Sequence, residues 1–258
     1  MNGVGAWLLN SGLGADLAIV PGGTGNNVAL VLGIPRDRRQ TLDIALHGTA
    51  TRRIDALRYH APAEPSPAGG KAPSRFIIQS GAWGYPADIA GRYAALRRGR
   101  IFRRLAYPLG GRIYRLLALA GLLREKRRKR RGEAGLLLEA RLPGEAIEAE
   151  VLAVFVGNDP TLGGGFHPCP RASLDDGLLD LCIVRSGGGT PLLPLLQSVG
   201  RGDHLALARD VEYRQTRGPI GISFSRPTPF LADGDIWLSS TAYVVEVVPG
   251  ALPVVVGR

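Results

Sequence analysis

The 258-residue chain contains only two cysteines, Cys169 and Cys182, and a single methionine. Two cysteines are too few for a disulfide framework, and they predict buried structural thiols in a reducing compartment. No run of 18 apolar residues is present, so we expect no membrane-spanning helix. The first residues also lack the basic stretch of a secretory signal. These absences favour a cytoplasmic globular protein.

Positive charge is abundant, with a net charge of +10, but it is not spread evenly. Residues 97–131 hold 14 lysines and arginines against one acid, Glu125. Leucines at helical spacing accompany this charge, and a basic amphipathic segment is typical of a membrane-surface element. Each basic residue near an anionic leaflet contributes about 1 kcal/mol. A solvated helix or a nucleic-acid patch would carry similar charge, but the apolar stripe favours the membrane.

A glycine-rich turn stands near the start of the chain. Apolar residues 17–20 lead into Pro21-Gly-Gly-Thr-Gly-Asn-Asn27, and a helix-like run over 28–32 follows. Backbone N–H groups at the start of a helix attract phosphate, and glycine lets a ligand approach closely. The sequence is neither a Walker A loop nor G-x-G-x-x-G. An ordinary turn between a strand and a helix is the alternative.

Four motifs in the same order resemble the diacylglycerol kinase catalytic-domain family, which includes bacterial lipid kinases and sphingosine kinases. They are the 21–27 turn with Leu32-Gly-Ile-Pro35, the pair Gly157-Asn158 followed by Gly163-Gly-Gly165, the segment 170–180, and Asp233-Gly-Asp235. The resemblance spans nearly the whole chain. It implies an ATP-dependent, Mg²⁺-assisted transfer of a phosphoryl group to a lipid hydroxyl, with diacylglycerol as an example.

One motif of the family is absent. Its GGDGT sequence precedes a helix that residues 1–9 resemble, with Asn2 matching the last polar position of the motif. We therefore expect a chain truncated at its N-terminus, before or at GGDGT, either as a fragment or as a genuinely shortened protein.

The pattern of elements predicts an α/β unit followed by an all-β unit. Helices are expected near 2–11, 26–33 and 39–47, with a strand near 16–20, and strands dominate from about residue 135. The resemblance implies a truncated α/β nucleotide-binding domain over 1–53 and a β-sandwich domain over 54–258. A basic helical segment over 86–131 would interrupt the second domain.

The predicted strands of the second part are separated by turns rich in glycine, proline and aspartate, with one helix near 190–199. They are expected at 52–59, 76–80, 135–141, 147–156, 178–185, 210–216, 219–225, 242–248 and 252–256.

The resemblance implies two catalytic carboxylates. Asp235 would be the general base that accepts the proton of the lipid hydroxyl. Asp55 would join a water network around the catalytic magnesium. A plain Asp-Gly hairpin turn at 233–234 and a surface aspartate at position 55 are the alternatives.

For the nucleotide, Thr24 with the backbone of Gly23 and Gly25 would contact phosphate, and Asn2 is a weaker candidate. Thr24 could instead, or in addition, cap the following helix. Asn2 could be a disordered terminal residue. Asn27 stands where the family has an aspartate, so we expect weaker attraction of metal there.

The resemblance implies a second, structural Mg²⁺ at the loop Ser173-Leu-Asp-Asp-Gly-Leu178, called the acidic loop below. Its ligands would be the Asp176 side chain and the carbonyls of Ser173 and Leu178, because Mg²⁺ prefers oxygen ligands. A plain acidic turn is the alternative.

The preferred hypothesis is therefore a lipid kinase that acts peripherally at the anionic inner face of the membrane. A non-catalytic lipid-binding remnant of such a kinase is the alternative. Nucleic-acid binding has only the charge in its favour, and the sequence does not indicate an oligomeric state.

Overall fold

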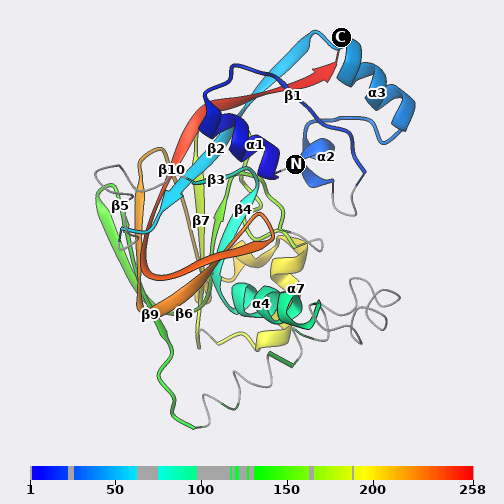
Figure 1. Cartoon of the computed structure of the whole chain (residues 1–258). Helices are drawn as coiled ribbons and strands as arrows, with labels where there is room; N and C mark the ends of the chain where they lie inside the picture. Colours follow the sequence, from blue (N-terminus) through cyan, green and yellow to red (C-terminus); the bar gives the residue numbers. More distant parts are fainter. Residues whose placement is uncertain are drawn as a thin grey trace.

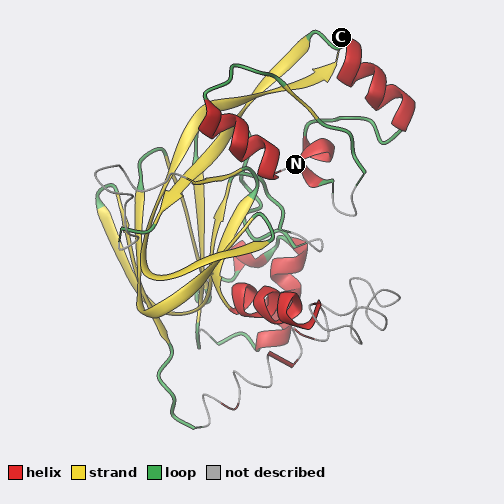
Figure 2. Cartoon of the chain, in the orientation of Figure 1, coloured by secondary structure: helices red, strands yellow, loops and turns green. Residues whose placement is uncertain are grey.

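The computed structural model describes most of the chain, in several stretches. These are residues 2–22, 26–62, 75–97, 131–162, 166–187 and 189–257, with positions 117, 120, 121 and 127. Helices α1 to α3 gather at one end with both chain termini, and strands fill most of the remainder (Figures 1 and 2).

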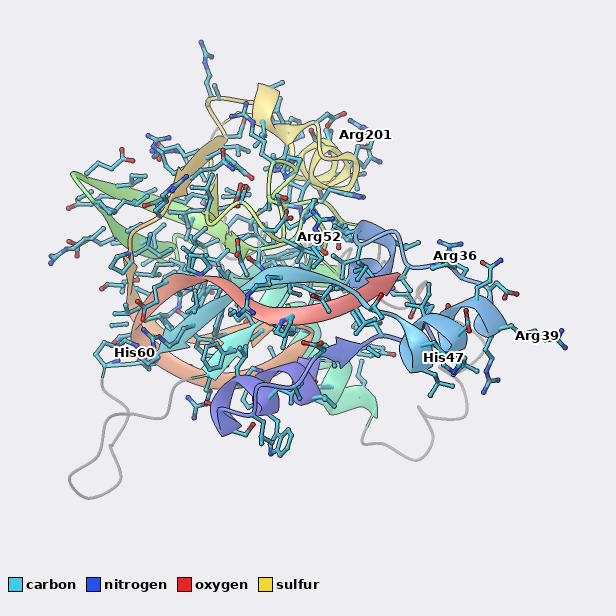
Figure 3. All side chains as sticks on the ribbon, turned by 90° about the horizontal axis from the view of Figure 1, so that it is seen from above. Arg36, Arg39, His47, Arg52, His60 and Arg201 are labelled. Atoms are coloured by element: carbon cyan, nitrogen blue, oxygen red, sulfur yellow. The ribbon has the colours of Figure 1, made fainter. Side chains whose placement is uncertain are left out.

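The N-terminal unit consists of three helices and a short strand: α1 (Asn2–Ser11), β1 (Leu17–Ala18), α2 (Asn27–Val31) and α3 (Arg38–His47). Helix α3 begins after Asp37, because the Asp37 carboxylate accepts hydrogen bonds from the backbone nitrogens of Arg39 (3.1 Å) and Gln40 (2.9 Å). Arg36, Arg39 and His47 point outward at this end of the molecule (Figure 3).

Two long antiparallel strands, β2 (Ala50–His60) and β10 (Asp235–Gly257), run from the N-terminal helices into the sandwich. The last part of β10 also pairs in parallel with β1, with Val254 opposite Leu17. The C-terminal residues thus return to the N-terminal unit. The domain boundary predicted at residue 53 falls inside β2 and stays a prediction.

The remaining strands form a sandwich with the order β3-β2-β10-β9-β4-β6-β7-β8, and β5 pairs with both β6 and β9. Both β6 and β9 pair with β5 along one half and with β4 along the other, so these two strands pass from one layer to the next and close the sandwich. The bounds are β3 (Arg75–Ile77), β4 (Ser80–Gly84), β5 (Leu136–Leu142), β6 (Glu145–Gly157), β7 (Leu179–Arg185), β8 (Val211–Thr216) and β9 (Ile220–Ala232).

Aromatic rings fill the space between the layers. Phe230 stacks on Trp83 with ring centroids 4.1 Å apart, and Tyr59 meets Phe230 edge-on at 4.8 Å. Trp83, Phe230 and Tyr59 are buried, as the alternation of apolar residues in these strands requires. The fold class predicted from the sequence, α/β followed by a β-sandwich, is confirmed.

Two helices cover one side of the sandwich: α4 (Tyr85–Arg97) and α7 (Leu192–Arg201), the latter followed by the 3-10 turn η1 (His204–Ala206). Helix α4 occupies the start of the segment predicted as basic and helical over 86–131. Most of the remainder of that segment lies outside the described residues. Cys169 and Cys182 are buried free thiols, as predicted.

Several predicted strand boundaries were wrong. The strand predicted at 219–225 continues to Ala232 as β9. The strand predicted at 76–80 is divided into β3 and β4, because the backbone N–H groups of Ile78 and Gln79 bond to the Asp233 carboxylate and not to a neighbouring strand. The strands predicted at 242–248 and 252–256 form the single strand β10. The Pro249-Gly250 step is an irregularity in the register of β10 and does not end the strand.

Candidate functional site

The side chain of Asn158 joins two parts of the chain at the end of β6. Its Nδ2 donates to the carbonyl oxygens of Asp55 and Ile78, both at 2.9 Å, and Asn158 is completely buried. The preceding Gly157 is required because a Cβ there would lie 2.5 Å from the Cβ of Cys169. The Gly157-Asn158 motif thus combines close packing with a double hydrogen-bond donor.

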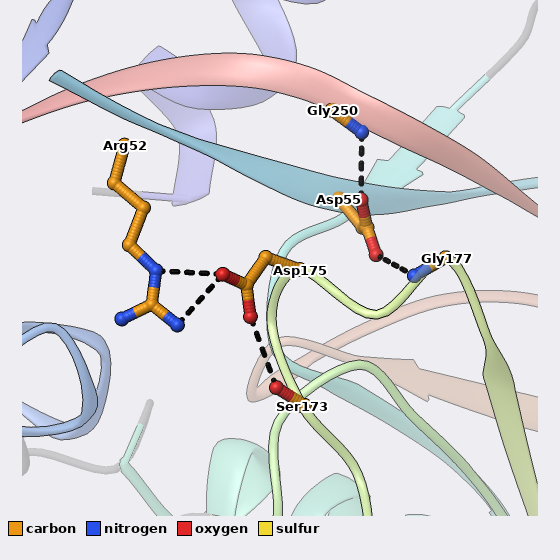
Figure 4. Close-up of polar contacts among 6 residues, drawn as sticks. All are labelled: Arg52, Asp55, Ser173, Asp175, Gly177 and Gly250. Carbon is orange, nitrogen blue, oxygen red and sulfur yellow. Dashed lines mark hydrogen bonds and ion pairs between the residues drawn. The ribbon is translucent and has the colours of Figure 1, made fainter.

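Asp55 extends this connection to the acidic loop. Its backbone N–H donates to the carbonyl of Leu174 at 2.6 Å. Its two carboxylate oxygens accept hydrogen bonds from the backbone nitrogens of Gly250 (2.6 Å) and Gly177 (2.7 Å), as Figure 4 shows. Asp55 is 2% exposed, so the alternative of a surface aspartate was wrong. The carboxylate fixes both the irregularity in β10 and the loop that contains Asp176.

The acidic loop has its own internal contacts. Arg52 forms an ion pair with Asp175 at 2.7 Å, and the hydroxyl of Ser173 donates to the other oxygen of Asp175 (Figure 4). Asp176 accepts a hydrogen bond from the backbone nitrogen of Leu178 at 2.9 Å. Burial raises the pKa of Asp176, and the charges of the nearby carboxylates Asp55 and Asp175 raise it further.

This loop has the chemistry of a site for a hard cation, because a cation would offset the repulsion among these carboxylates and because the available donors are oxygen atoms. Within the described part of the chain, no cluster of three or more His, Cys, Asp or Glu side chains could hold a metal ion. A cation here would therefore depend on backbone carbonyls and water for most of its ligands.

Asp233 fixes the β9–β10 turn. Its carboxylate accepts hydrogen bonds from the backbone nitrogens of Ile78 (2.8 Å), Gln79 (2.9 Å) and Ser80 (3.2 Å). Burial raises the pKa of Asp233 to about 6, although these three bonds favour the charged form.

The turn itself is a two-residue hairpin. Asp233 and Gly234 both have positive φ (49° and 94°), as a type I′ turn requires, and Ala232 pairs with Asp235 across it. The Asp-Gly hairpin considered from the sequence is therefore present. Asp235 is exposed directly after the turn.

Two further buried carboxylates, Asp159 and Asp180, lie near Asp233 and Asp176 respectively. Asp159 accepts hydrogen bonds from the backbone nitrogen (2.7 Å) and hydroxyl (2.6 Å) of Thr161, and burial raises its pKa. Asp180 accepts a hydrogen bond from the Tyr213 hydroxyl, and burial raises its pKa to about 6.

Helix α2 packs close to this network. Val28 and Ala29 belong to the same buried cluster as Ile54, Ile78 and Leu174. Ile54 precedes Asp55 in the chain, Leu174 accepts the backbone N–H of Asp55, and Ile78 accepts a hydrogen bond from Asn158. The N-cap position of α2 is Asn26, with φ of 49°. The predicted phosphate contacts Gly23, Thr24 and Gly25 lie outside the described residues. Asn2 belongs to α1 and Asn27 begins α2; the side chain of Asn2 is not described.

The network therefore joins Asp55, Asn158, the 173–178 loop and the 233–235 turn, which are four widely separated parts of the sequence. The sequence motifs predicted no role for Asn158 and indicated Asp233 only as part of a turn. A polar residue directly after the long apolar run of β6 is a signal that could have identified Asn158 as a buried donor.

The fold is that of a bacterial diacylglycerol kinase. A crystal structure of a diacylglycerol kinase from Bacillus anthracis matches with a TM-score of 0.59 at 17% identity, covering 94% of this chain and 67% of that one. Residues 1–59 match the diacylglycerol kinase catalytic domain, and residues 134–256 match the YegS C-terminal NAD kinase beta sandwich-like domain.

The sequences of curated proteins agree. A Stenotrophomonas maltophilia protein named "Probable lipid kinase YegS-like" is 30% identical over 238 residues, which cover 91% of this chain and 67% of that protein. The diacylglycerol kinase of Mycobacterium tuberculosis is 28% identical over 245 residues, covering 95% and 70%. The chain belongs to the diacylglycerol kinase catalytic-domain family, as the motifs predicted. None of the described helices has both the length and the hydropathy needed to cross a bilayer.

Proposed function

We propose that this protein is an ATP-dependent lipid kinase that transfers the γ-phosphate to the hydroxyl of a lipid such as diacylglycerol. The observation that carries the proposal is the hydrogen-bond network around Asn158 and Asp55. It joins the family motifs at 157–158 and 170–180, and through Ile78, which also bonds to Asp233, the motif at 233–235, in one region next to helix α2. Phosphoryl transfer depends mainly on positioning and charge stabilisation, and a rigid buried network supports positioning.

The family resemblance supplies the proposed roles of the residues. Asp235, exposed at the end of the hairpin, would accept the proton of the lipid hydroxyl. Gly23, Thr24 and Gly25 would contact the phosphates, and Asn2 the nucleotide. Asp55 would hold its neighbouring backbone segments and orient water near the reacting phosphate. Mg²⁺, when bound, would neutralise charge on the transferred phosphoryl group.

The direct test is turnover by the purified protein with ATP, Mg²⁺ and diacylglycerol in mixed micelles. Loss of a general base lowers the rate by about 10²–10⁴-fold, so Asp235→Ala should reduce turnover by that factor. Asp16→Asn, at an exposed aspartate of the N-terminal unit, is the matched control and should keep wild-type turnover. Equal turnover in Asp235→Ala and the wild type would refute the role of Asp235.

A second Mg²⁺ would be held by the Asp176 carboxylate and the carbonyls of Ser173 and Leu178. Binding to the folded state alone raises the melting temperature. Added Mg²⁺ should therefore raise the melting temperature of the wild type more than that of Asp176→Asn. Equal shifts in the two proteins would argue against this site.

We also propose that the protein works peripherally, at the anionic inner face of the membrane. The 14 basic residues between positions 97 and 131 support this, because anionic lipids attract such segments. Association driven by charge weakens with salt, so binding to vesicles that contain phosphatidylglycerol should fall steeply as salt is raised. Binding that does not depend on salt would contradict this part of the proposal.

A non-catalytic lipid-binding remnant is the second candidate. The observation in its favour is the reduced negative charge near the predicted metal. Asn27 is uncharged at the start of α2, and both carboxylate oxygens of Asp55 already accept backbone hydrogen bonds. Vesicle binding without any heat of ATP binding in calorimetry would favour the remnant, and measurable phosphoryl transfer would exclude it.

A further inference from the structure

The strand that follows the Asp233-Gly234 turn exposes two large apolar side chains. Ile236 is 37% exposed and Trp237 is 55% exposed, whereas Tyr243 and Val245 further along β10 are buried. Adjacent exposed apolar residues of this size on a rigid element indicate a contact surface more often than isolated ones do.

The anchored turn and the irregular register of β10 determine how Ile236 and Trp237 are placed. The turn before them is held by the three hydrogen bonds of the Asp233 carboxylate, which fix the position at which β10 begins. The register of β10 against β9 shifts between Ile236 and Ser239, and such bulges redirect side chains. Trp237 lies within this irregular stretch.

We infer that Ile236 and Trp237 enter the headgroup region of an anionic phospholipid bilayer and thereby set Asp235 at the depth of the acceptor hydroxyl. The inference rests on the proposed lipid kinase function for its meaning, but the insertion itself requires no turnover. Two residues span about 7 Å along a strand, so Asp235 stays close to the level at which Trp237 lies.

The chemistry of the hairpin and its surroundings favours a bilayer. Tryptophan has an apolar ring with a polar N–H group and is enriched where membrane meets water. Helix α4 packs against both β9 and β10 and lies next to them in Figure 1. The basic stretch begins at the C-terminal end of α4, and its charge complements an anionic leaflet.

A second copy of the chain fits these side chains less well. A stable protein interface buries about 800 Å² on each partner, which is far more than two side chains supply. A bilayer needs no such area, because basic charge and a few inserted apolar side chains act together.

The experiment uses the full chain, without nucleotide, and vesicles of equal parts phosphatidylcholine and phosphatidylglycerol. Sedimentation measures partitioning, and brominated acyl chains quench the fluorescence of an inserted tryptophan. The chain offers a matched control, because Trp7 on α1 is 58% exposed while Trp83 is buried. Trp7→Phe therefore leaves Trp237 as the exposed fluorophore, and Trp237→Phe leaves Trp7.

We expect brominated lipid to quench Trp237 and not Trp7. Trp237→Ala should weaken partitioning into the vesicles roughly tenfold. A loss of this size is expected when an indole ring that is about half inserted into an apolar environment is removed. Trp7→Ala should change it by less than about twofold. Circular dichroism checks that Trp237→Ala is folded.

Quenching of Trp7 alone, or partitioning of Trp237→Ala at the wild-type level, would overturn the inference. So would light scattering that shows a dimer which Trp237→Ala dissociates, because a second copy would then cover the surface. A protein that inserts Trp237 but transfers no phosphate would refute the proposed function and leave the inserted hairpin supported.

Discussion

The Oδ2 atom of Asp233 lies 2.8 Å from the backbone nitrogen of Ile78, so the β9–β10 turn is tied to the segment between β3 and β4. The carbonyl of the same Ile78 accepts a hydrogen bond from Asn158, which also bonds to the carbonyl of Asp55. Three hydrogen bonds in series therefore connect the turn that precedes Asp235 to the strand that carries Asp55. Asp233 in this turn and Asp235 directly after it should have separable effects on stability and on chemistry.

Asp233→Asn should lower the free energy of unfolding by about 1–3 kcal/mol, because the new amide nitrogen would face a backbone N–H donor in place of an acceptor. Asparagine tolerates the φ of 49°, so backbone strain contributes little. Urea unfolding followed by circular dichroism measures the change. A variant as stable as the wild type would mean that these hydrogen bonds do not hold the turn.

Asp235→Asn is the matched comparison two residues away. Because Asp235 is exposed, its stability should stay within about 0.5 kcal/mol of the wild type. Under the proposed function its turnover should fall, since an amide cannot accept the hydroxyl proton. The reverse outcome, a destabilised Asp235→Asn with full turnover, would contradict the division of roles between the two aspartates.

Asn158→Leu tests the centre of the network. Leucine has a similar size but donates no hydrogen bond, so the buried carbonyls of Asp55 and Ile78 would lose a donor. We expect a loss of about 2–4 kcal/mol in the free energy of unfolding. The control is Asn10→Ala, since Asn10 also donates to a carbonyl, that of Ala6, but is exposed. Similar small losses in both variants would show that the network contributes little.

The elements with a clear hydrophobic period were predictable. Strand β5 alternates buried and exposed positions, and its predicted range of 135–141 differs by one residue from the observed Leu136–Leu142. The Asp-Gly pair at 233–234 is a strong hairpin signal and forms the expected turn. The family motifs also predicted the fold class, because their order along the chain is specific even where each motif is short.

Long-range hydrogen bonds were not predictable from local pattern. The Asp233 carboxylate bonds to nitrogens about 155 positions earlier, and this contact is what separates β3 from β4. Pro249-Gly250 predicted a break in the last strand, yet β10 continues, because Asp55 accepts the N–H of Gly250 and holds the irregular register. A pattern within one window of sequence contains no information about such partners.

The dependence of stability on pH should include Asp180, whose pKa burial raises to about 6 from an ordinary value of about 3.9. The folded state therefore binds the proton more tightly than the unfolded state does. This contribution to stability is fully present below about pH 4 and is lost as the pH rises through about 6. By neutral pH the loss amounts to about 3 kcal/mol.

Asp180→Asn should remove that part of the pH dependence. The asparagine oxygen still accepts the Tyr213 hydroxyl, and the side chain no longer has a charge to bury. Urea unfolding between about pH 4.5 and 7.5 should give a flatter curve for the variant than for the wild type. The curve does not become level, because Asp233 has a pKa of about 6 as well. Parallel curves would mean that Asp180 is not the titrating group.

Two glycines should respond to alanine in opposite directions. A Cβ at Gly81 on β4 would lie 2.5 Å from the ring of Phe230, which already stacks on Trp83 and has no room to move. Gly81→Ala should therefore cost about 1–3 kcal/mol through overpacking. At Gly91 in α4 a Cβ meets no atom within 4 Å, and alanine should stabilise the helix by about 0.5–1 kcal/mol. Calorimetry should show a lower melting temperature for the first variant and a higher one for the second. Equal shifts would contradict the packing of the Phe230 ring against β4.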